Sequence, residues 1–159
     1  MLFRSVAFWA GLGDSVGQVC VNEYDEGSSS WIQRGSNCFE GYSVSLSEDG
    51  SVLAIGSPWS DGKGIVQIFE YSTTSLSWTQ RGSNINGEAD GENFGHAVSL
   101  ANNGNWVPIG APNYDASVCE GCGGEGRVQV FKWDSEGEVW KQKGEDIDGE
   151  FPQIGRAHV

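Results

Sequence analysis

The sequence predicts an all-β fold made of repeated four-stranded antiparallel units, and three observations support this prediction. Glycine supplies 24 of the 159 residues, about twice the usual share of roughly 7%, which indicates many turns. A glycine precedes a tryptophan by 14 residues three times, at Gly17 and Trp31, Gly64 and Trp78, and Gly126 and Trp140. No stretch of ten residues carries a helical apolar stripe. Such units match the blades of a β-propeller, which we favour over a β-sandwich.

The first expected unit, residues 6–37, is a partial blade. It contains an apolar segment from Val6, a strand from Gly17 to Tyr24 and a strand around Trp31. Each apolar or alternating run is short and bounded by glycine or polar residues, as strands are. We therefore expect the last three strands of one blade here.

The second expected unit, residues 38–85, is a complete blade. Residues 42–47 alternate between polar and apolar, a turn follows at Asp49 and Gly50, and residues 52–56 are continuously apolar. A strand over residues 64–71 and a strand around Trp78 complete the four.

The third expected unit, residues 86–150, repeats this order with two loop insertions. Residues 96–100 alternate, an Asn-Gly turn follows, and residues 106–110 are apolar. Pro108 departs from the pattern, because it stands where the second unit has Ala54, inside a strand that should be paired.

The two ends of the chain suggest that it is a fragment. Residues 154–159 follow no repeat and resemble the read-through translation of a sequencing adapter, so we expect a non-native tail there. The resulting fold is an open arc of about two complete blades plus a partial one. Such an arc exposes apolar faces at both ends, so we expect the chain alone to associate or to fold only marginally.

The charge of the chain restricts its partners. It has 9 Lys and Arg against 22 Asp and Glu, a net charge of -13. Because nucleic-acid binding requires clustered basic residues, we expect no nucleic-acid partner. No apolar run reaches the roughly 18 residues of a membrane helix, so we expect no membrane span in this chain.

Two landmarks give a family resemblance. Phe94-Gly95 followed by Gly110-Ala111-Pro112 resembles the FG-GAP repeat, in its second type, of integrin-alpha-like propellers. The second unit has a degenerate copy with Gly56 and Pro58. The resemblance implies scaffold roles for these residues and for the repeated tryptophans Trp31, Trp78 and Trp140.

The resemblance also implies a function. FG-GAP propellers act as binding, adhesion or interaction scaffolds at the cell surface or outside the cell, with protein or carbohydrate ligands held by the loops between strands. We therefore expect a non-enzymatic role. The alternative is a fragment of a propeller enzyme, a lyase or a glycosidase, whose site lies in missing blades.

One acidic stretch is a weak calcium candidate. Oxygen-bearing side chains occupy every second position at Asn84, Asn86, Glu88 and Asp90, and Ca²⁺ prefers six to eight oxygen ligands. Acidic surface loops commonly look like this, and no other cofactor is expected. His96 stands where the second unit has Tyr42, which favours a packed or channel-lining residue over a catalytic base.

The four cysteines bear on the compartment. Cys119 and Cys122 are spaced as a tight disulfide, a redox pair or half of a zinc site, and we favour a structural or local thiol pair. Cys20 and Cys38 lie in the first unit. In an oxidising compartment Cys119 and Cys122 would bond, in line with the extracellular location that the resemblance implies.

Overall fold

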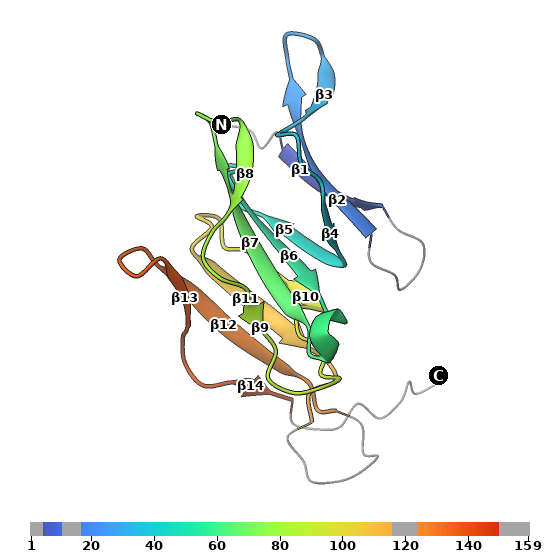
Figure 1. Ribbon diagram of the computed structural model, residues 1–159, viewed down its shortest axis with the longest axis vertical. Coiled ribbons are helices and arrows are strands. Elements are labelled where there is room, and N and C mark those ends of the chain that lie inside the picture. The colour runs from blue at the N-terminus through green and yellow to red at the C-terminus, as the bar shows by residue number, and fades with distance from the viewer. Residues whose placement is uncertain (1–4, 11–16, 116–123, 150–159) are drawn as a thin grey trace.

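The computed structural model describes residues 5–10, 17–115 and 124–149, which form three antiparallel sheets lying side by side (Figure 1). The expected all-β class is confirmed. The one helical element in the described part of the chain is the short 3-10 turn η1 (Ser60–Gly62). In these residues no helix is long and apolar enough to cross a membrane.

In the described part of the chain, the first sheet has four strands. Its strands are β1 (Ser5–Ala10), β2 (Gly17–Asp25), β3 (Ser30–Gln33) and β4 (Phe39–Gly41). They follow the order β1-β2-β3, and β4 also pairs with β2. The sheet therefore extends to residue 41, four residues past the expected boundary at residue 37.

The second sheet is a complete meander. It runs β5-β6-β7-β8, and β9 also pairs with β7. Because β8 and β9 pair with different parts of β7, they are two halves of one outer strand, interrupted at residues 81–84. The strands are β5 (Ser43–Leu46), β6 (Val52–Ser57), β7 (Ile65–Ser72), β8 (Ser77–Gln80) and β9 (Ile85–Asn86).

The third sheet repeats this arrangement as β10-β11-β12-β13, with β14 also paired to β12. Its strands are β10 (Ala97–Val98), β11 (Trp106–Ala111), β12 (Arg127–Asp134), β13 (Val139–Gln142) and β14 (Ile147–Asp148). The antiparallel meanders stacked face to face form the arc of a propeller.

Proline 108 explains why the inner strand β10 is short. Pro108 pairs with Val130 of β12, and its carbonyl accepts a hydrogen bond from Ser99 N at 3.2 Å. In a strand, the N and O of one residue point to the same side, so the missing N–H of Pro108 faces β10. In the second sheet the equivalent Ala54 pairs with Ser45 of β5. Consequently β10 has two paired residues where β5 has four.

Two apolar clusters fill the spaces between the sheets. Between the first and second sheets lie Val19, Val21, Leu53, Ile55, Phe69 and Trp78. Between the second and third lie, among others, Val66, Ile68, Phe94, Val107, Ile109 and Trp140. Since alternate residues of each strand point to opposite faces, a blade with neighbours on both sides must be apolar on both.

A repeated contact, which we call the clasp, closes the outer edge of the first interface. Trp78 Nε1 donates a hydrogen bond to Arg34 O at 2.8 Å, and the Arg34 guanidinium lies 4.4 Å from the centroid of the Tyr71 ring. Gly35 has φ +83°, and a Cβ there would stand 2.9 Å from Trp78 Cδ1. Only glycine accepts both conditions.

The second interface has the same clasp. Trp140 Nε1 donates to Arg81 O at 2.9 Å, and the Arg81 guanidinium lies 4.7 Å from the Trp133 ring centroid. Gly82 has φ +79°, and a Cβ there would stand 2.8 Å from Trp133. The repeated Gln-Arg-Gly string and the repeated tryptophan are therefore the two halves of one contact.

Candidate functional site

Three aromatic rings gather where the inner strands of the second and third sheets begin. Tyr42 precedes β5 and His96 precedes β10, and their ring centroids are 5.0 Å apart. Trp59, in the connection from β6 to β7, lies 4.8 Å from Tyr42 in an edge-on arrangement. Trp59 is 41% exposed. In a closed propeller ring, whose inner strands line the axis, this aromatic group would lie at the mouth of the axial channel.

The segment that carries His96 is held by close backbone contacts. Ser43 Oγ donates to Gly95 O at 2.7 Å, and Gly95 N donates to Gly110 O at 3.1 Å. A Cβ on Gly56 would stand 2.0 Å from Gly95 O, and one on Gly64 would stand 2.1 Å from Phe94 O. These glycines let two backbones touch, which fixes His96 beside Tyr42.

The landmark residues of the repeat motif have the following places. Phe94, Ala111 and Pro58 are buried, Gly56 and Gly95 form the backbone contact between the second and third sheets, and Gly110 and Pro112 line a groove. Trp78 and Trp140 are buried in the clasps, whereas Trp31 is 53% exposed.

A buried ion cluster joins the third sheet to the loop that precedes β10. Arg127 Nη2 donates to Glu92 Oε2 at 2.8 Å, and both side chains are 1% exposed. Arg127 Nη1 donates to Glu88 Oε2 at 2.9 Å and Asp146 Oδ2 at 2.8 Å. The guanidinium also stacks on Tyr114 at 3.8 Å. Burial alone would lower the pKa of Arg127, but the three carboxylates outweigh it and raise that pKa.

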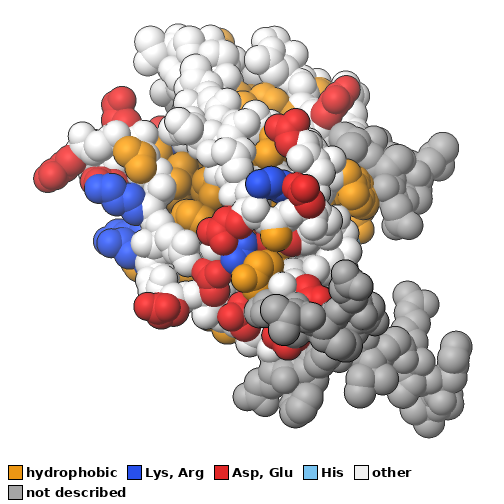
Figure 2. Space-filling view, turned by 60° about the horizontal axis from the view of Figure 1, so that its bottom comes forward, with side chains coloured by type: hydrophobic (Ala, Val, Ile, Leu, Met, Phe, Trp, Pro, Cys, Tyr) orange, Lys and Arg blue, Asp and Glu red, His pale blue; other side chains and the backbone are white. Residues whose placement is uncertain are grey.

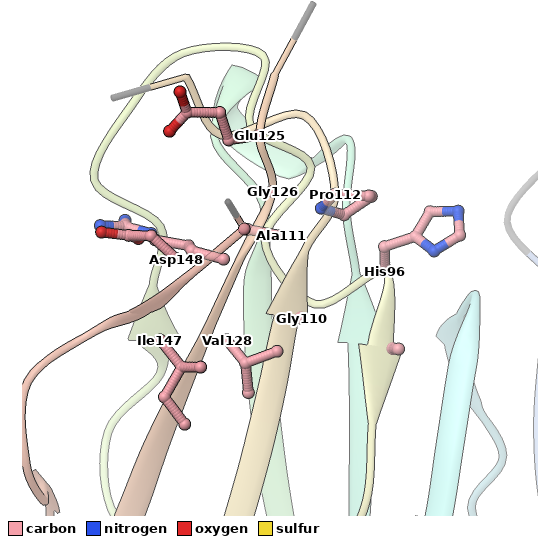
Figure 3. A pocket seen from close by; sticks show the side chains of 12 residues that line it. His96, Gly110, Ala111, Pro112, Glu125, Gly126, Val128, Ile147 and Asp148 are labelled. Carbon is pink, nitrogen blue, oxygen red and sulfur yellow. The ribbon is translucent and has the colours of Figure 1, made fainter. Parts of the chain in front are cut away.

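A groove of about 400 Å³ runs along the outer face of the third sheet (Figure 3). Its floor contains Ala97, Gly110, Val128 and Ile147, and His96 and Asp148 stand at opposite sides of it. This is the face that a following blade covers in a closed ring, so we assign the groove to blade packing and the aromatic group to ligand contact.

Two residues of the acidic stretch considered for calcium, Asn84 and Glu88, bind other side chains of the protein. Asn84 Oδ1 accepts hydrogen bonds from Gln80 at 2.7 Å and Gln67 at 3.3 Å. Glu88 pairs with Arg127, Asn86 lies in β9, and Asp90 is exposed. In the described ranges, no group of three or more His, Cys, Asp or Glu residues could hold a metal ion. Calcium binding here stays an untested prediction.

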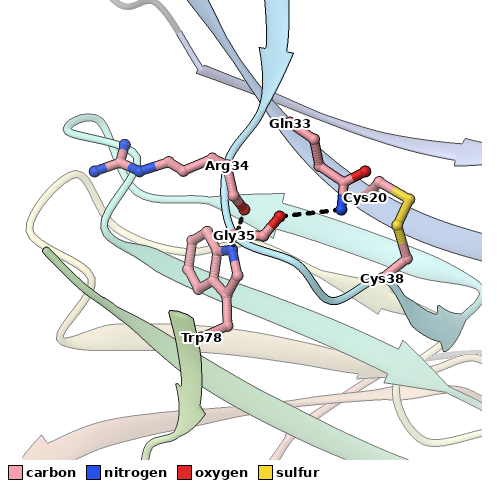
Figure 4. The surroundings of a disulfide bond; sticks show 6 residues. All are labelled: Cys20, Gln33, Arg34, Gly35, Cys38 and Trp78. Carbon is pink, nitrogen blue, oxygen red and sulfur yellow. Dashed lines mark hydrogen bonds between the residues drawn. A yellow bond between two sulfur atoms is a disulfide. The ribbon is translucent and has the colours of Figure 1, made fainter. Parts of the chain in front are cut away.

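A second contact, which we call the clamp, holds the loop that follows the clasp residues in each sheet. It consists either of side-chain hydrogen bonds or of a disulfide. In the second sheet Asn84 Oδ1 accepts the hydrogen bonds of Gln80 and Gln67. In the third sheet Asp146 Oδ1 accepts hydrogen bonds from Gln142 Nε2 at 2.7 Å and from Gln129 Nε2 at 2.9 Å. In the first sheet a disulfide joins Cys20, at the position of Gln67, to Cys38 (Figure 4). It closes the loop that carries Arg34.

This disulfide was not predicted from the sequence. The pair that was considered for a disulfide, Cys119 and Cys122, lies outside the described residues. A signal for the bridge does exist in the repeat: Cys20 replaces the repeated glutamine, and Cys38 follows Asn37, the counterpart of Asn84.

Removing the bridge between Cys20 and Cys38 is expected to destabilise the chain. For a sequence separation of 18, the chain-entropy cost corresponds to about 3 kcal/mol of unfolding free energy. Urea unfolding of the parent and of Cys38→Ser, each with and without dithiothreitol, measures the loss. Dithiothreitol should lower the urea midpoint of the parent and leave that of Cys38→Ser unchanged. An effect of dithiothreitol on the variant would come from the other cysteines. Equal midpoints for parent and variant would contradict the expectation.

Asp146 is expected to make the third clamp sensitive to acid. Burial would raise the pKa of Asp146, but hydrogen bonds from Gln129 and Gln142 and the charge of Arg127 outweigh it and hold that pKa below its ordinary 3.8. A carboxyl with a depressed folded-state pKa stabilises the fold above its unfolded pKa, and this stability is lost as pH falls below about 4. Urea midpoints across this range should fall less steeply for Asp146→Asn than for the parent. Parallel pH profiles would refute the assignment.

Comparisons with known proteins identify the fold. No family model and no curated protein matches the chain. A solved structure of a candidate 6-phosphogluconolactonase from Bacteroides uniformis is similar, with a TM-score of 0.56 and 13% identity over 85% of this chain. The periplasmic gluconolactonase of Pseudomonas aeruginosa is also similar, with a TM-score of 0.50 and 17% identity over 91% of this chain. This chain spans 35% and 39% of those two chains.

These comparisons correct the family resemblance. The predicted resemblance to the FG-GAP family is wrong. No family model supports it, and the similar solved structures are named as lactonases rather than integrin-type proteins. The physical reason lies in Gly56, Gly64 and Gly95, which are required wherever two blades touch backbone to backbone. Motifs of this kind therefore report blade packing, which unrelated propellers share.

The functional expectations built on the resemblance are corrected with it. The adhesion or interaction scaffold and the non-enzymatic role are both contradicted, because the similar structures are named as lactonases. The alternative of a lyase or glycosidase is contradicted by the same finding, since a lactonase cleaves an ester.

Proposed function

We propose that this chain is part of a hydrolase of sugar lactones. The observation that carries the proposal is the aromatic group of Tyr42, Trp59 and His96 at the axial mouth. Exposed aromatic faces suit the apolar faces of a sugar ring, and an imidazole is the side chain most often used as a general base near neutral pH. The similar lactonase structures support the same activity.

The chemistry requires one base and one water molecule. His96 takes a proton from water, the resulting hydroxide attacks the lactone carbonyl carbon, and the ring C–O bond breaks. The proton then passes from His96 to the departing ring oxygen, which gives the open hydroxy acid. Trp59 and Tyr42 hold the sugar ring beside the imidazole. Further groups would come from the blades that complete the ring.

The charges near the mouth favour a neutral lactone over a phosphorylated one. Arg127 is already bound by Glu88, Glu92 and Asp146, and Lys63 Nζ donates to Glu88 O at 3.0 Å. Carboxylates spread over the face shown in Figure 2 and surround the basic side chains in its middle. We therefore expect kcat/KM for glucono-1,5-lactone to exceed that for its 6-phosphate by about tenfold or more, as unfavourable steering of an anion allows.

A lactonase assay tests the proposal. Acid release from glucono-1,5-lactone is followed by pH-stat for the parent protein that contains all the blades of its ring and for its His96→Tyr variant, which inserts the residue that the second sheet holds at this position. The variant should keep the fold and lose about 100-fold or more in rate, the contribution of a general base. A parent rate equal to the uncatalysed rate, or an unchanged rate in His96→Tyr, would overturn the proposal.

The compartment is proposed on separate grounds. The bond between Cys20 and Cys38 favours an oxidising environment, because cytosolic thiols are kept reduced. We propose an extracellular or periplasmic location. Mass spectrometry of the unreduced protein from its native source checks this, and free thiols at both positions would contradict it.

A further inference from the structure

A cavity of about 330 Å³, which we call the rim pocket, lies between the second and third sheets, where β9 lies beside β12 and β13 (Figure 1). Both of its walls belong to this chain, so it is separate from the face that a following blade would cover. Tyr42, Trp59 and His96 are not among its lining residues. Its volume is at the lower end of the roughly 300–1,000 Å³ of small-molecule sites.

The rim pocket exists because the second interface lacks an aromatic ring that the first interface has. Phe39 and Ile85 hold the same register position in their sheets, as Phe69 and Phe131 do. At the first interface the rings of Phe39 and Phe69 pack with centroids 4.1 Å apart. At the second interface the smaller Ile85 leaves space beside Phe131, and both residues line the pocket.

One buried wall residue, Gln129, has an oxygen without a donor. Gln129 is 2% exposed and lines the rim pocket. Its Nε2 lies 2.9 Å from Asp146 Oδ1 and 3.5 Å from both Glu88 Oε1 and Gln142 Oε1, and these three acceptors fix the orientation of the amide. Its Oε1 accepts no hydrogen bond from the described residues. Because buried polar atoms normally have a partner, this oxygen indicates a ligand that donates.

The other polar groups of the wall can both donate and accept. The Asn86 carboxamide and Asn84 Nδ2 make no hydrogen bond to described residues, and a carboxamide offers two donors and an acceptor. The described lining residues include no Lys, Arg or His, so an anion would find no counter-charge. The one carboxylate, on Glu88, is already bound to Arg127. This wall therefore suits neutral hydroxyl groups, which also donate and accept.

We propose that the rim pocket binds one neutral pyranose ring. Gln129 Oε1 accepts a hydrogen bond from one hydroxyl, the carboxamides of Asn84 and Asn86 bind others, and the apolar face of the sugar lies on Phe131 and Trp140. The proposal does not rest on the lactonase activity, because the rim pocket and the aromatic group share no residue.

Saturation-transfer difference NMR tests the binding with the parent protein that contains all the blades of its ring. The probes are the methyl pyranosides of glucose, galactose and mannose, which have no lactone carbonyl and so cannot report lactonase activity. At least one should bind with a Kd on the order of millimolar, as expected for so small a ligand. EDTA should leave this binding unchanged, because the carboxamides bind the hydroxyls directly.

Four variants locate the binding. Ile85→Phe supplies the ring that fills the first interface and should weaken binding at least tenfold. Asn86→Ala, at an exposed position, should weaken it about two- to tenfold, the effect of one hydrogen bond. Glu40→Ala changes the exposed residue at the register of Asn86 in the first sheet and should bind like the parent. His96→Tyr should also bind like the parent.

The outcomes separate this proposal from the proposed function. It is overturned if none of the three glycosides binds, if EDTA abolishes binding, or if Ile85→Phe and Asn86→Ala, with the parent's circular dichroism, bind like the parent. Binding that is lost in His96→Tyr and kept in Ile85→Phe would place the sugar at the aromatic group and also overturn it. Absence of lactonase activity in the parent would overturn the proposed function alone.

Discussion

Replacing Glu92 with alanine is expected to lower the free energy of unfolding by about 3 to 5 kcal/mol, the cost of breaking a buried ion pair. Glu92 Oε2 accepts from Arg127 Nη2 at 2.8 Å, and Glu92 Oε1 accepts from the backbone amides of Glu88 and Ala89. The substitution therefore leaves a buried guanidinium short of one counter-charge and two amides without their acceptor. Chemical denaturation monitored by tryptophan fluorescence measures the loss.

Two further variants separate charge from volume at this position. Glu92→Gln keeps an acceptor oxygen for the amides but removes the charge next to Arg127. Its free energy of unfolding should therefore lie between those of the parent and the alanine variant. Asp90→Ala changes an exposed carboxylate of the same loop and should stay within about 0.5 kcal/mol of the parent. A Glu92→Ala variant as stable as Asp90→Ala would show that the cluster adds nothing to stability.

Trp78→Ala is expected to cost about 3 to 5 kcal/mol, the range for truncating a large buried aromatic. The ring packs against Gly35 and Tyr71, and its indole N–H satisfies Arg34 O. Its removal opens a cavity at the outer edge of the first interface and frees the loop of the clasp. Thermal and urea unfolding should both show the loss.

The chain contains its own matched control for that experiment. Trp31 occupies the same position of the repeat, but it is 53% exposed rather than 5%. At a protein concentration low enough to keep the chain monomeric, Trp31→Ala should change stability by no more than about 1 kcal/mol. Equal losses in Trp31→Ala and Trp78→Ala would mean that the clasp is not what makes Trp78 important.

Much of the fold could be predicted because strand signals are local. The spacing from Gly64 to Trp78 reports a hairpin of fixed length, and the apolar run at residues 52–56 reports a strand buried on both faces, which is β6. The first sheet reaches residue 41 instead of 37 because β4 pairs with β2. That pairing is non-local and leaves no periodic signal.

The candidate site was harder to predict, because it depends on contacts between sheets. His96 and Tyr42 are 54 positions apart in the numbering, yet their rings touch because both precede inner strands. The alignment of the two residues was visible in the repeat, but their proximity was not. The partners of Glu88 and Asn84 were hidden for the same reason, since an acidic loop looks alike whether it binds calcium, arginine or water.

The proline in β11 has a consequence for motion near the proposed ligand contact. Free energies of local opening depend on how many ladder bonds and packed side chains hold a segment. Because Pro108 offers no N–H, β10 has two paired residues, and His96 comes directly before them. The amides of β10 should therefore exchange with solvent deuterium faster than those of β5, which has four. Of the two inner strands, β10 beside His96 is therefore expected to open locally more often than β5.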